Sequence, residues 1–504
     1  MKFKHLILGM AALCAVTDRI LLANEASQPN VLIILADDLG YGDTGCYGGK
    51  ILTPHMDKLS AAGLRFTDAH TSSSVCSPTR YALLTGRYNW RSKLKRGVLG
   101  GLSPRLIEPE RMTIASLLKE HGYRTGCVGK WHLGMDWVVK PGATVSELSV
   151  EPREQVFNVD FARPISNGPN SVGFDYYYGI SASLDMVPYA FIENDRVTSL
   201  PTLDRDFLMM HARSNGGRTR KGPTAPDFEA ADVLPALTRQ ACAFIDQHAN
   251  RGKTSPFFLY VPLTSPHTPI LPKDEWLGKS GMNPYADFVM QTDAAIGEIV
   301  TALDRHELTD NTLVVLTSDN GCSPQAKFDE LGVHGHNPSG PLRGHKADLF
   351  EGGHRVPFIV RWPGHVAAGK TSAAIVCLTD VMATLAEIIG QSLPANSGED
   401  SISFLRILRG EPGTRDQLVS HSINGSFAIR QGPWKLLLCP DSGGWSAPRP
   451  DSKQADGLPP VQLYQLEQDL AEQNNLHDRE PARVNELKAL LDKLVADGRS
   501  RPNP

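Results

Sequence analysis

The chain has 504 residues, of which 41% are hydrophobic, and its formal net charge at pH 7 is −4. This length suffices for one large α/β domain with a smaller one, and the apolar content supports a sizeable core. A weakly acidic chain lacks the basic surface that nucleic-acid binding requires, so we expect no nucleic-acid partner. An anionic substrate would have to be bound locally, by a few Arg, Lys and His side chains in a cleft.

The N-terminal residues have the pattern of an export signal. Two lysines precede an apolar run over residues 6–16, and small residues follow the run. Such a run is too short to span a membrane as a mature helix. We therefore expect a signal peptide over residues 1–26, no stable membrane insertion, and a protein exported to the periplasm or the extracellular space. For the cysteines, disulfide pairing and free buried thiols are both open, because their spacing shows no disulfide framework.

The first strongly patterned segment is NVLIILADD, residues 30–38. Its continuous apolar run predicts a strand that is buried on both faces of a parallel sheet. Asp37 and Asp38 follow at the carboxyl end of this strand, where open α/β sheets bind ligands. Two adjacent carboxylates repel each other unless a cation or a strong donor lies between them. The pair is therefore either part of a metal site, or an ordinary pair of helix N-caps or a solvated turn.

Residues 75–87 read VCSPTRYALLTGR and predict a helix that begins near Cys76. Pro78 suits the first turn of a helix, where its missing N–H group costs nothing. Cys76 would then lie at the helix N-terminus, among unpaired backbone N–H groups that favour an anion. Arg80 lies one turn further along and points to the same side. Without further signals, a lone cysteine reads as a buried thiol or half of a disulfide.

Polar residues also follow three further buried strands, which are predicted over residues 123–128, 256–263 and 312–317. Lys130 and His132 follow the first of these strands, and they would project to one side if the backbone stays extended. His267 follows the second strand within Ser-Pro-His-Thr-Pro. Taken alone, each could be a polar residue of an ordinary surface loop.

Asp319 and Asn320 follow the third of these strands. Together with Asp37 and Asp38 they offer hard oxygen ligands, and no Cys–His cluster lies nearby in the sequence. That composition suits Ca²⁺ or Mg²⁺ rather than Zn²⁺. A parallel sheet would bring all four strand ends to one edge.

The remaining segments predict several further helices and, after about residue 392, a small unit of strands and a helix. Apolar periodicity and capping residues predict helices over residues 53–63, 113–122, 232–248, 290–303, 380–389 and 484–495. After about residue 392, short segments alternate with Gly and Pro turns, which is typical of a small antiparallel sheet. Residues 140–222 are weakly patterned, and loops of this length are often functional.

Several of these segments resemble the type I sulfatases. Residues 76–87 match the family signature C-x-P-x-R followed by x-x-x-L-T-G-R, and residues 129–134, GKWHLG, resemble its second signature. The P-H-x-P element around His267 resembles the one that supplies a catalytic histidine. Residues 344–357 resemble the segment that carries the last catalytic lysine, here Lys346. Residues 462–476 resemble an element near sulfatase C-termini, with Leu470 where the family often has proline.

The resemblance implies the alkaline-phosphatase-like α/β fold. We expect a large mixed, mainly parallel sheet flanked by helices, with a smaller C-terminal domain of antiparallel sheet plus helix. The expected boundaries are a catalytic domain over residues 29–391 and a C-terminal subdomain over residues 392–504.

The resemblance also implies a formylglycine (3-oxoalanine), which a maturation enzyme makes from the cysteine of the signature, Cys76. It implies Ca²⁺, with Mg²⁺ as the alternative. The implied metal ligands are Asp37, Asp38, modified Cys76, Asp319 and Asn320.

The family's mechanism implies a role for each remaining motif residue. The hydrated aldehyde attacks sulfur, while Lys130, Lys346 and the cation bind the sulfate oxygens. His267, with Lys346, protonates the leaving oxygen, and His132 takes the remaining hydroxyl proton. Arg80 holds the nucleophile in place.

The expected substrate is a sulfated sugar, with galactose or N-acetylgalactosamine sulfate as the specific hypothesis. Asp185 lies in the weakly patterned loop region, and Arg343 and His345 lie in a His- and Arg-rich stretch around Lys346. These three residues are candidates for substrate binding, although each also reads as an ordinary loop residue. A metal role for the histidines of that stretch is a further alternative.

Three other functions stay open at this level. A formylglycine-dependent phosphodiesterase or phosphonate monoester hydrolase would share much of this site. A two-zinc phosphatase would need more His and Asp ligands and a Ser or Thr nucleophile. A non-catalytic relative that binds sulfated glycans would be expected to have lost at least one motif residue, and the chain retains them all.

Overall fold

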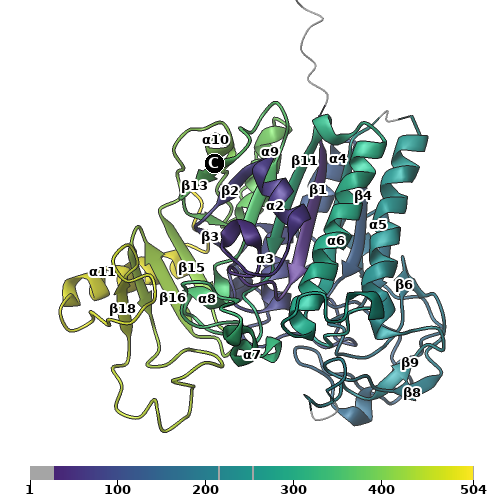
Figure 1. Ribbon diagram of the computed structural model, residues 1–504, viewed down its shortest axis with the longest axis horizontal. Helices are drawn as coiled ribbons and strands as arrows, with labels where there is room; N and C mark the ends of the chain where they lie inside the picture. The colour runs from purple at the N-terminus through teal and green to yellow at the C-terminus, as the bar shows by residue number, and fades with distance from the viewer. Residues whose placement is uncertain (1–27, 214–215, 253–254, 503–504) are drawn as a thin grey trace, which may run out of the picture.

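The computed structural model describes residues 28–213, 216–252 and 255–502 (Figure 1). The predicted signal peptide and Cys14 lie outside the described residues. A ten-stranded sheet, here the large sheet, crosses the centre of the molecule. Its strands are β1 (Asn30–Asp37), β2 (Leu64–Phe66), β4 (Arg124–Lys130), β5 (Tyr176–Ile180), β6 (Ile192–Glu193), β7 (Arg196–Val197), β10 (Phe257–Pro266), β11 (Thr312–Ser318), β12 (Phe358–Arg361) and β13 (Lys370–Ser372).

The large sheet is mixed and mainly parallel, as the sequence predicts. Its strand order is β13-β2-β12-β11-β1-β10-β4-β5-β6-β7. β1 pairs in parallel with β10 and β11, β10 pairs in parallel with β4, and β4 pairs in parallel with β5. β12 runs antiparallel to both of its neighbours. Two small two-stranded sheets join β3 (Ala69–His70) to β14 (Val376–Cys377), and β8 (Leu203–Arg205) to β9 (Gly222–Thr224).

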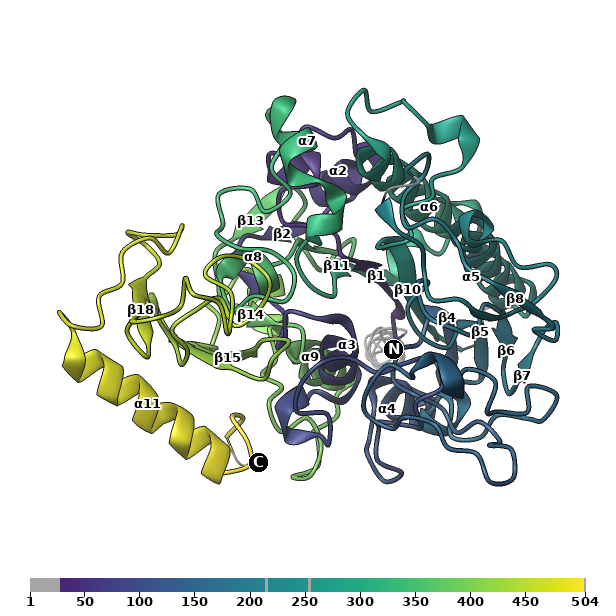
Figure 2. The same ribbon diagram turned by 90° about the horizontal axis from the view of Figure 1, so that it is seen from below.

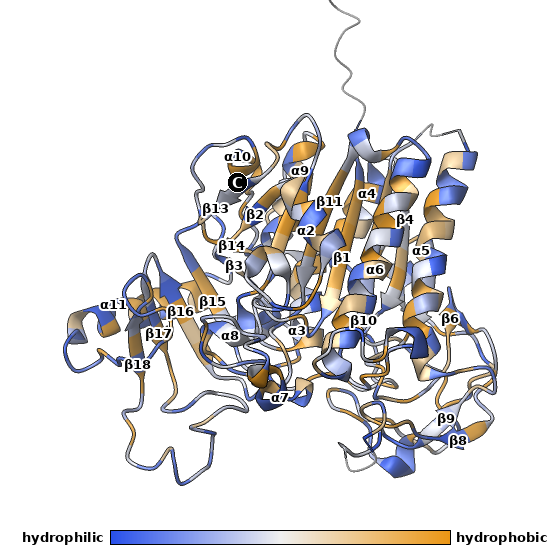
Figure 3. Cartoon of the chain, viewed as in Figure 1, coloured by the Kyte–Doolittle hydropathy of each residue, from blue (hydrophilic) through white to orange (hydrophobic). Residues whose placement is uncertain are grey.

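Helices cover both faces of the large sheet, which explains why its central strands are apolar throughout (Figure 3). Side chains alternate between the faces of a strand, so Val31 and Ile33 of β1 lie in one apolar cluster and Leu32 and Ile34 in the other. α2 (Pro54–Ala61), α5 (Val233–Asn250) and α6 (Pro284–Arg305) pack in the cluster of Leu32. α3 (Cys76–Thr85), α4 (Ile114–Glu120) and α9 (Asp380–Ile388) pack in the cluster of Val31.

The helix predicted over residues 290–303 begins earlier, at Pro284. The Asn283 side chain caps it by accepting a hydrogen bond from the backbone N–H of Ala286 at 3.1 Å. Asparagine at the cap followed by proline is a strong start signal. The prediction missed this start, although Tyr285, Phe288 and Val289 lie in the same apolar cluster as the later turns of the helix. Three short helices complete the set, namely α7 (Phe328–Val333), α8 (Glu351–His354) and α10 (Leu405–Leu408).

A second, smaller layer lies beside the large sheet (Figure 2). It is a four-stranded antiparallel sheet of β15 (Gln417–His421), β16 (Phe427–Gln431), β17 (Trp434–Leu437) and β18 (Gln462–Gln465) with α11 (Pro481–Ala496). We call residues 417–496 the C-terminal unit. α11 buries Val484, Leu487, Leu491 and Leu494 against this sheet, as its amphipathic pattern predicts.

Segments that follow position 391 still pack with the large sheet. Leu393, Phe404 and Leu405 belong to the same apolar cluster as Val31. The proposed boundary between residues 391 and 392 stays a prediction.

Within the described part of the chain, every cysteine is a free thiol; five of them are buried, and Cys46 and Cys242 are partly exposed. Within the described ranges, no helix combines the length and the apolar character needed to cross a membrane.

Candidate functional site

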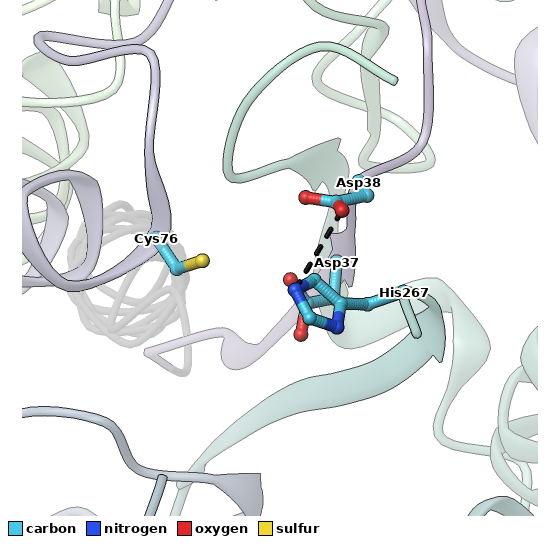
Figure 4. Close-up of side chains that lie close together, drawn as sticks. All are labelled: Asp37, Asp38, Cys76 and His267. Carbon is cyan, nitrogen blue, oxygen red and sulfur yellow. Dashed lines mark ion pairs between the residues drawn. The ribbon is translucent and has the colours of Figure 1, made fainter. Parts of the chain in front are cut away.

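The four polar strand ends meet at one edge of the large sheet. β11, β1, β10 and β4 are consecutive neighbours and all run in parallel. Their carboxyl ends therefore bring together Asp319 and Asn320, Asp37 and Asp38, His267, and Lys130 and His132. Cys76 reaches the same place from the first residue of α3 (Figure 4). Ligand atoms of Asp37, Asp38, Cys76 and His267 all lie within 4.8 Å of one another.

Three carboxylates and one amide form the acidic centre of this site. Asp37, Asp38, Asp319 and Asn320 are each at most 1% exposed. The Asp38 backbone N–H donates to Asp319 Oδ1 at 3.2 Å, and the Asn320 amide donates to Asp38 Oδ1 at 2.7 Å. Asp37 Oδ1 and Asn320 Oδ1 are buried acceptors without a hydrogen-bond partner among the described residues. Buried unpartnered oxygens of this kind suit a hard divalent cation.

Burial and mutual repulsion act on the protonation of these carboxylates. The pKa of Asp319 is raised to about 6 by burial and by the negative charge of Asp37. Burial would also raise the pKa of Asp37, but the charges of Lys130, His267 and Arg80 hold it well below its usual range. Any added cation would favour the ionised form of both groups.

Arg80 links the helix of Cys76 to the acidic centre. Its guanidinium donates to Asp319 Oδ2 from Nε at 3.1 Å and from Nη2 at 2.7 Å. Nη1 donates to the carbonyl oxygen of Lys130 at 3.0 Å. Arg80 is fully buried, so these fixed bonds set the position of α3 relative to β11 and β4.

Cys76 is a thiol that cannot act as a strong nucleophile in this environment. It is 3% exposed, and burial raises its pKa to about 11, although Lys130 and Lys346 oppose that shift. The thiolate is the reactive form of cysteine, and it is scarce at neutral pH under these conditions. As an unmodified thiol, Cys76 is therefore a poor nucleophile at neutral pH.

Two lysines flank the acidic centre. Lys130 Nζ lies 2.6 Å from Asp37 Oδ2, and Lys346 Nζ lies 2.7 Å from Asp38 Oδ1. Burial alone would lower the pKa of Lys346, but the negative charge of Asp38 raises it above the usual value. The Lys346 segment packs closely against the residues that follow Asn320: Lys346 N–H donates to the carbonyl oxygen of Cys322 at 2.9 Å. A Cβ on Gly321 would lie 1.8 Å from the carbonyl oxygen of Gly352, so only glycine allows this approach.

His132 differs from the extended geometry considered in the sequence analysis. Its φ angle is 55°, in the left-handed region, so the chain turns at this point. His132 Nε2 lies 2.8 Å from the carbonyl oxygen of Leu99 and donates to it, while Nδ1 is buried without a partner among the described residues. Burial and the charge of Lys130 hold its pKa well below the usual value. His132 is therefore neutral and has a free lone pair on Nδ1.

His267 lies beside Asp38 in the acidic centre. Its Nδ1 donates to the carbonyl oxygen of Thr268 at 2.5 Å, and its Nε2 lies 3.7 Å from Asp38 Oδ2 (Figure 4).

The sequence analysis missed one residue of this site, Ser183. Ser183 Oγ accepts from Lys130 Nζ at 3.1 Å and lies 3.3 Å from His267 Nδ1. A single serine in a weakly patterned loop carries no local signal of such contacts.

The substrate-binding candidates lie in three different environments. Asp185 pairs with Arg220 at 3.3 Å, and its Oδ1 is buried without a partner among the described residues. Arg343 donates to the carbonyl oxygen of Glu472 at 2.5 Å, so its guanidinium contacts the C-terminal unit. His345 Nδ1 lies 3.0 Å from the carbonyl oxygen of Lys346. A role in substrate binding stays a prediction for all three.

A family model described as Sulfatase matches residues 29–391. The chain belongs to the sulfatase family. It is 34% identical over 525 residues to N-acetylgalactosamine-6-O-sulfatase of Bacteroides thetaiotaomicron, covering 97% of this chain and 98% of the relative. It is 32% identical to human arylsulfatase A, covering 99% of this chain and 93% of the relative.

Solved structures agree with this result. A Bacteroides thetaiotaomicron structure described under the metabolism of multiple glycosaminoglycans has a TM-score of 0.80 at 34% identity, covering 93% of this chain and 99% of that one. The crystal structure of Ps i-CgsB in complex with k-i-k-neocarrahexaose has a TM-score of 0.66 at 27% identity, covering 94% of each chain. This sulfatase is a sulfuric ester hydrolase, and its family uses a formylglycine and a divalent metal.

Replacing Arg80 by alanine should lower the free energy of unfolding of this sulfatase by about 3–5 kcal/mol, because Asp319 loses its buried partner. The matched control is Arg406→Ala, which removes a guanidinium from an exposed pair with Glu411. That control should cost at most about 1 kcal/mol. Urea denaturation of both variants measures the difference, and equal losses would contradict a structural role of Arg80 in the site.

Proposed function

We propose that this sulfatase removes O-sulfate groups from carbohydrates of galactose or N-acetylgalactosamine type. Formylglycine made from Cys76 and a bound Ca²⁺ ion would take part, with Mg²⁺ as the alternative ion. The main support is one arrangement: Cys76 at a helix N-terminus, facing a buried acidic centre that is flanked by two lysines and two histidines. The relative from Bacteroides thetaiotaomicron named above supports the sugar type, because its name specifies N-acetylgalactosamine.

The metal would be held by Asp37, Asp38, Asp319, Asn320 and the modified Cys76. The unpartnered oxygens of Asp37 and Asn320 support this assignment, since both are buried acceptors. A divalent ion there supplies positive charge that polarises a sulfate oxygen. Formylglycine supplies a hydrated aldehyde as the nucleophile in place of the inert thiol.

The lysines would bind the sulfate group. Lys130 and Lys346 bond to different carboxylates, and each keeps at least one further N–H donor for a sulfate oxygen, because an ammonium group has three. Ammonium groups fixed in a dry site stabilise charge where it develops in the transition state. Ser183 holds Lys130 by accepting a hydrogen bond at 3.1 Å.

The histidines would move protons at two different atoms. His267 directs Nε2 into the site while Nδ1 donates to Thr268, so Nε2 is the atom that would protonate the leaving alcohol, with help from Lys346. His132 directs Nδ1 as an unprotonated base, because Nε2 donates to the Leu99 carbonyl oxygen. Its depressed pKa keeps this base neutral even in mildly acidic solution.

Recognition of the sugar is assigned to Asp185, Arg343 and His345 as a proposal. The buried Oδ1 of Asp185 would accept from a sugar hydroxyl group. We further propose that the protein is exported to the periplasm or extracellular space, and that a formylglycine-generating enzyme is its maturation partner.

The first test is mass spectrometry of the Cys76 peptide from protein made in its native host, followed by a substrate panel. We expect the mass of the aldehyde, and sulfate release from galactose and N-acetylgalactosamine sulfates. The panel also contains a steroid sulfate, an aryl phosphodiester and a phosphonate monoester. Faster turnover of any of these three would overturn the proposed substrate class. An unmodified thiol in a protein that binds sulfated glycans without cleaving them would favour a binding role.

Replacing His132 by alanine should separate the two halves of turnover. Nδ1 of His132 is assigned to the later proton transfer, so the first alcohol should leave at a near-normal rate. We expect a burst of about one alcohol per active site, followed by steady turnover slower by about 10²–10⁴-fold. Stopped-flow assays with an aryl sulfate measure both phases. Rapid steady turnover by the variant would contradict the role of His132.

Calcium should stabilise the protein through Asn320. At a Ca²⁺ concentration about 100 times its Kd, we expect the free energy of unfolding to rise by about 2.7 kcal/mol. In Asn320→Ala this gain should shrink, because one oxygen ligand is lost. Asn474→Ala is the control, since Asn474 is exposed and lies in the C-terminal unit. Thermal unfolding with and without a chelator measures the effect, and equal gains in both variants would count against the assigned metal site.

A further inference from the structure

Eight ionisable side chains lie buried where the C-terminal unit meets the large sheet. We call them the junction cluster, and each is at most 9% exposed. Its members are Asp68, His70, Glu351, His354, Arg355, Arg430, Lys435 and Glu472. None of them belongs to the site described above, and burying so many charges requires close mutual pairing.

Lysine and arginine groups already neutralise the acids of this cluster. Lys435 Nζ lies 2.9 Å from Glu351 and 2.9 Å from Glu472, and Arg430 donates to both oxygens of Asp68 at 2.7 and 2.8 Å. His70, Glu351 and His354 could in principle hold a metal ion. Here the Lys435 ammonium group takes the place that a metal ion would occupy, because it also donates to His354 at 3.1 Å. The junction cluster is therefore a hydrogen-bond network rather than a metal site.

The partners of His70 determine which of its nitrogens carries the proton. Burial lowers the pKa of His70, so the ring is neutral and carries one N–H group. Its Nε2 lies 2.7 Å from Asp68 Oδ1 and 3.2 Å from Arg430 Nη1. The Arg430 Nη1 group donates to Asp68 Oδ1 at the shorter distance of 2.8 Å. An ionised carboxylate only accepts hydrogen bonds, so the proton is on Nε2 and Nδ1 is an acceptor.

The protonation of His354 follows from that of His70. Burial and the charge of Lys435 hold the pKa of His354 well below its usual value, so this ring is neutral too. Its Nδ1 lies 3.0 Å from Nδ1 of His70 and must donate, which leaves Nε2 to accept from Lys435. The other tautomer would donate from Nε2 to the Leu349 carbonyl oxygen at 3.1 Å. The Nδ1 atoms of the two rings would then face each other as unprotonated acceptors, which is unfavourable.

Lys435 thus donates to His354, His354 donates to His70, and His70 donates to Asp68. Arg430 also donates to Asp68. Arg430 and Lys435 are directly paired residues of β16 and β17. Two cations in facing positions repel each other, and the network between them compensates that repulsion. The chain of bonds therefore begins and ends on the C-terminal unit.

The two histidines lie on the two segments that carry catalytic groups of the proposed function. His70 precedes Cys76 by six residues on the chain leading into α3, and His354 follows Lys346 by eight. The backbones of these segments also bond to each other. Thr71 N–H donates to the carbonyl oxygen of His354 at 2.8 Å, and Ala347 N–H donates to that of Ser74 at 2.9 Å.

We propose that His70 and His354 are positioning residues for the sulfatase reaction, whose imidazole–imidazole hydrogen bond fixes the Cys76 segment against the Lys346 loop. The proposal rests on the proposed function, which places the nucleophile on one of these segments and a sulfate-binding lysine on the other. Misplacing reacting groups by about 1 Å can cost 10²-fold in rate. The C-terminal unit takes part in catalysis through this bond, because Lys435 fixes the tautomer of His354.

Two substitutions of His354 separate its two hydrogen bonds. In His354→Asn, the amide nitrogen replaces Nδ1 and still donates to His70, while the bond from Lys435 is lost. In His354→Gln, the amide oxygen replaces Nε2 and still accepts from Lys435, while no donor faces His70. We expect the Gln variant to lose about 10- to 100-fold in kcat, and the Asn variant to retain most of it.

The matched control is Arg415→Met. Arg415 is 7% exposed and pairs with Asp380 at 2.5 Å, but it contacts neither catalytic segment. This variant should lower the melting temperature and leave kcat near the wild-type value, which separates lost stability from lost positioning. All rates are measured with an aryl sulfate at a temperature where each variant is folded, and are divided by the formylglycine content from mass spectrometry.

The outcomes distinguish this inference from the proposed function. An inactive, fully modified wild-type enzyme would refute the proposed function and leave the structural network untouched. An active wild type with equal losses in the Asn and Gln variants, or with no loss in either, would overturn the positioning role.

Neutron diffraction of the wild type tests the same network without any variant. A deuteron on His354 Nδ1 and another on His70 Nε2 would support the inference. A deuteron on His354 Nε2 would overturn it.

Discussion

Three carboxylates lie buried side by side at the carboxyl edge of the large sheet, and the surrounding structure compensates their charge. Asp37, Asp38 and Asp319 are almost completely buried. Like charges repel each other more strongly in the protein interior than in water. Arg80, Lys130 and Lys346 supply one positive charge for each of them. These three cations come from α3, from β4 and from the loop before α8, so the charge requirement connects segments that are far apart in the sequence.

In the proposed function, the same cations would also serve the chemistry of the sulfatase. A sulfate ester is an anion, and it would be repelled by an uncompensated acidic centre. Lysines that are already fixed by carboxylates can donate their remaining hydrogens to sulfate oxygens without reorganisation, which is the basis of electrostatic stabilisation in dry active sites. The unpartnered oxygens of Asp37 and Asn320 leave room in this scheme for a divalent ion.

The C-terminal unit uses a comparable solution at its contact with the large sheet. Lys435 and Arg430 bring two cations into a buried interface, where Glu351, Glu472 and Asp68 receive them. A buried ion pair rarely adds much stability over an apolar contact, but it tolerates only one geometry. That property suits an interface that has to hold the Cys76 segment and the Lys346 loop in fixed relative positions.

Several elements could be predicted closely because their signals are local. β1, β10 and β11 are continuous apolar runs, and the sulfatase signature from Cys76 to Arg87 is contiguous in the chain. The start of α6 at Pro284 and the turn at His132 were not predicted. The start of α6 is signalled by the Asn283 cap and Pro284 rather than by apolar spacing, and the turn at His132 accompanies its hydrogen bond to Leu99.

The sequence by itself determined the family, the fold class and the identity of the motif residues, because each of these is encoded in short contiguous stretches or in strand-length apolar runs. Only the tertiary structure decided which atoms meet. It shows that Ser183 contacts Lys130 and His267, that His132 Nδ1 has no partner among the described residues, and that His70 bonds to His354. His70 and His354 are separated by 284 residues. Contacts of this kind arise from the packing of whole elements, so no local pattern of residues encodes them.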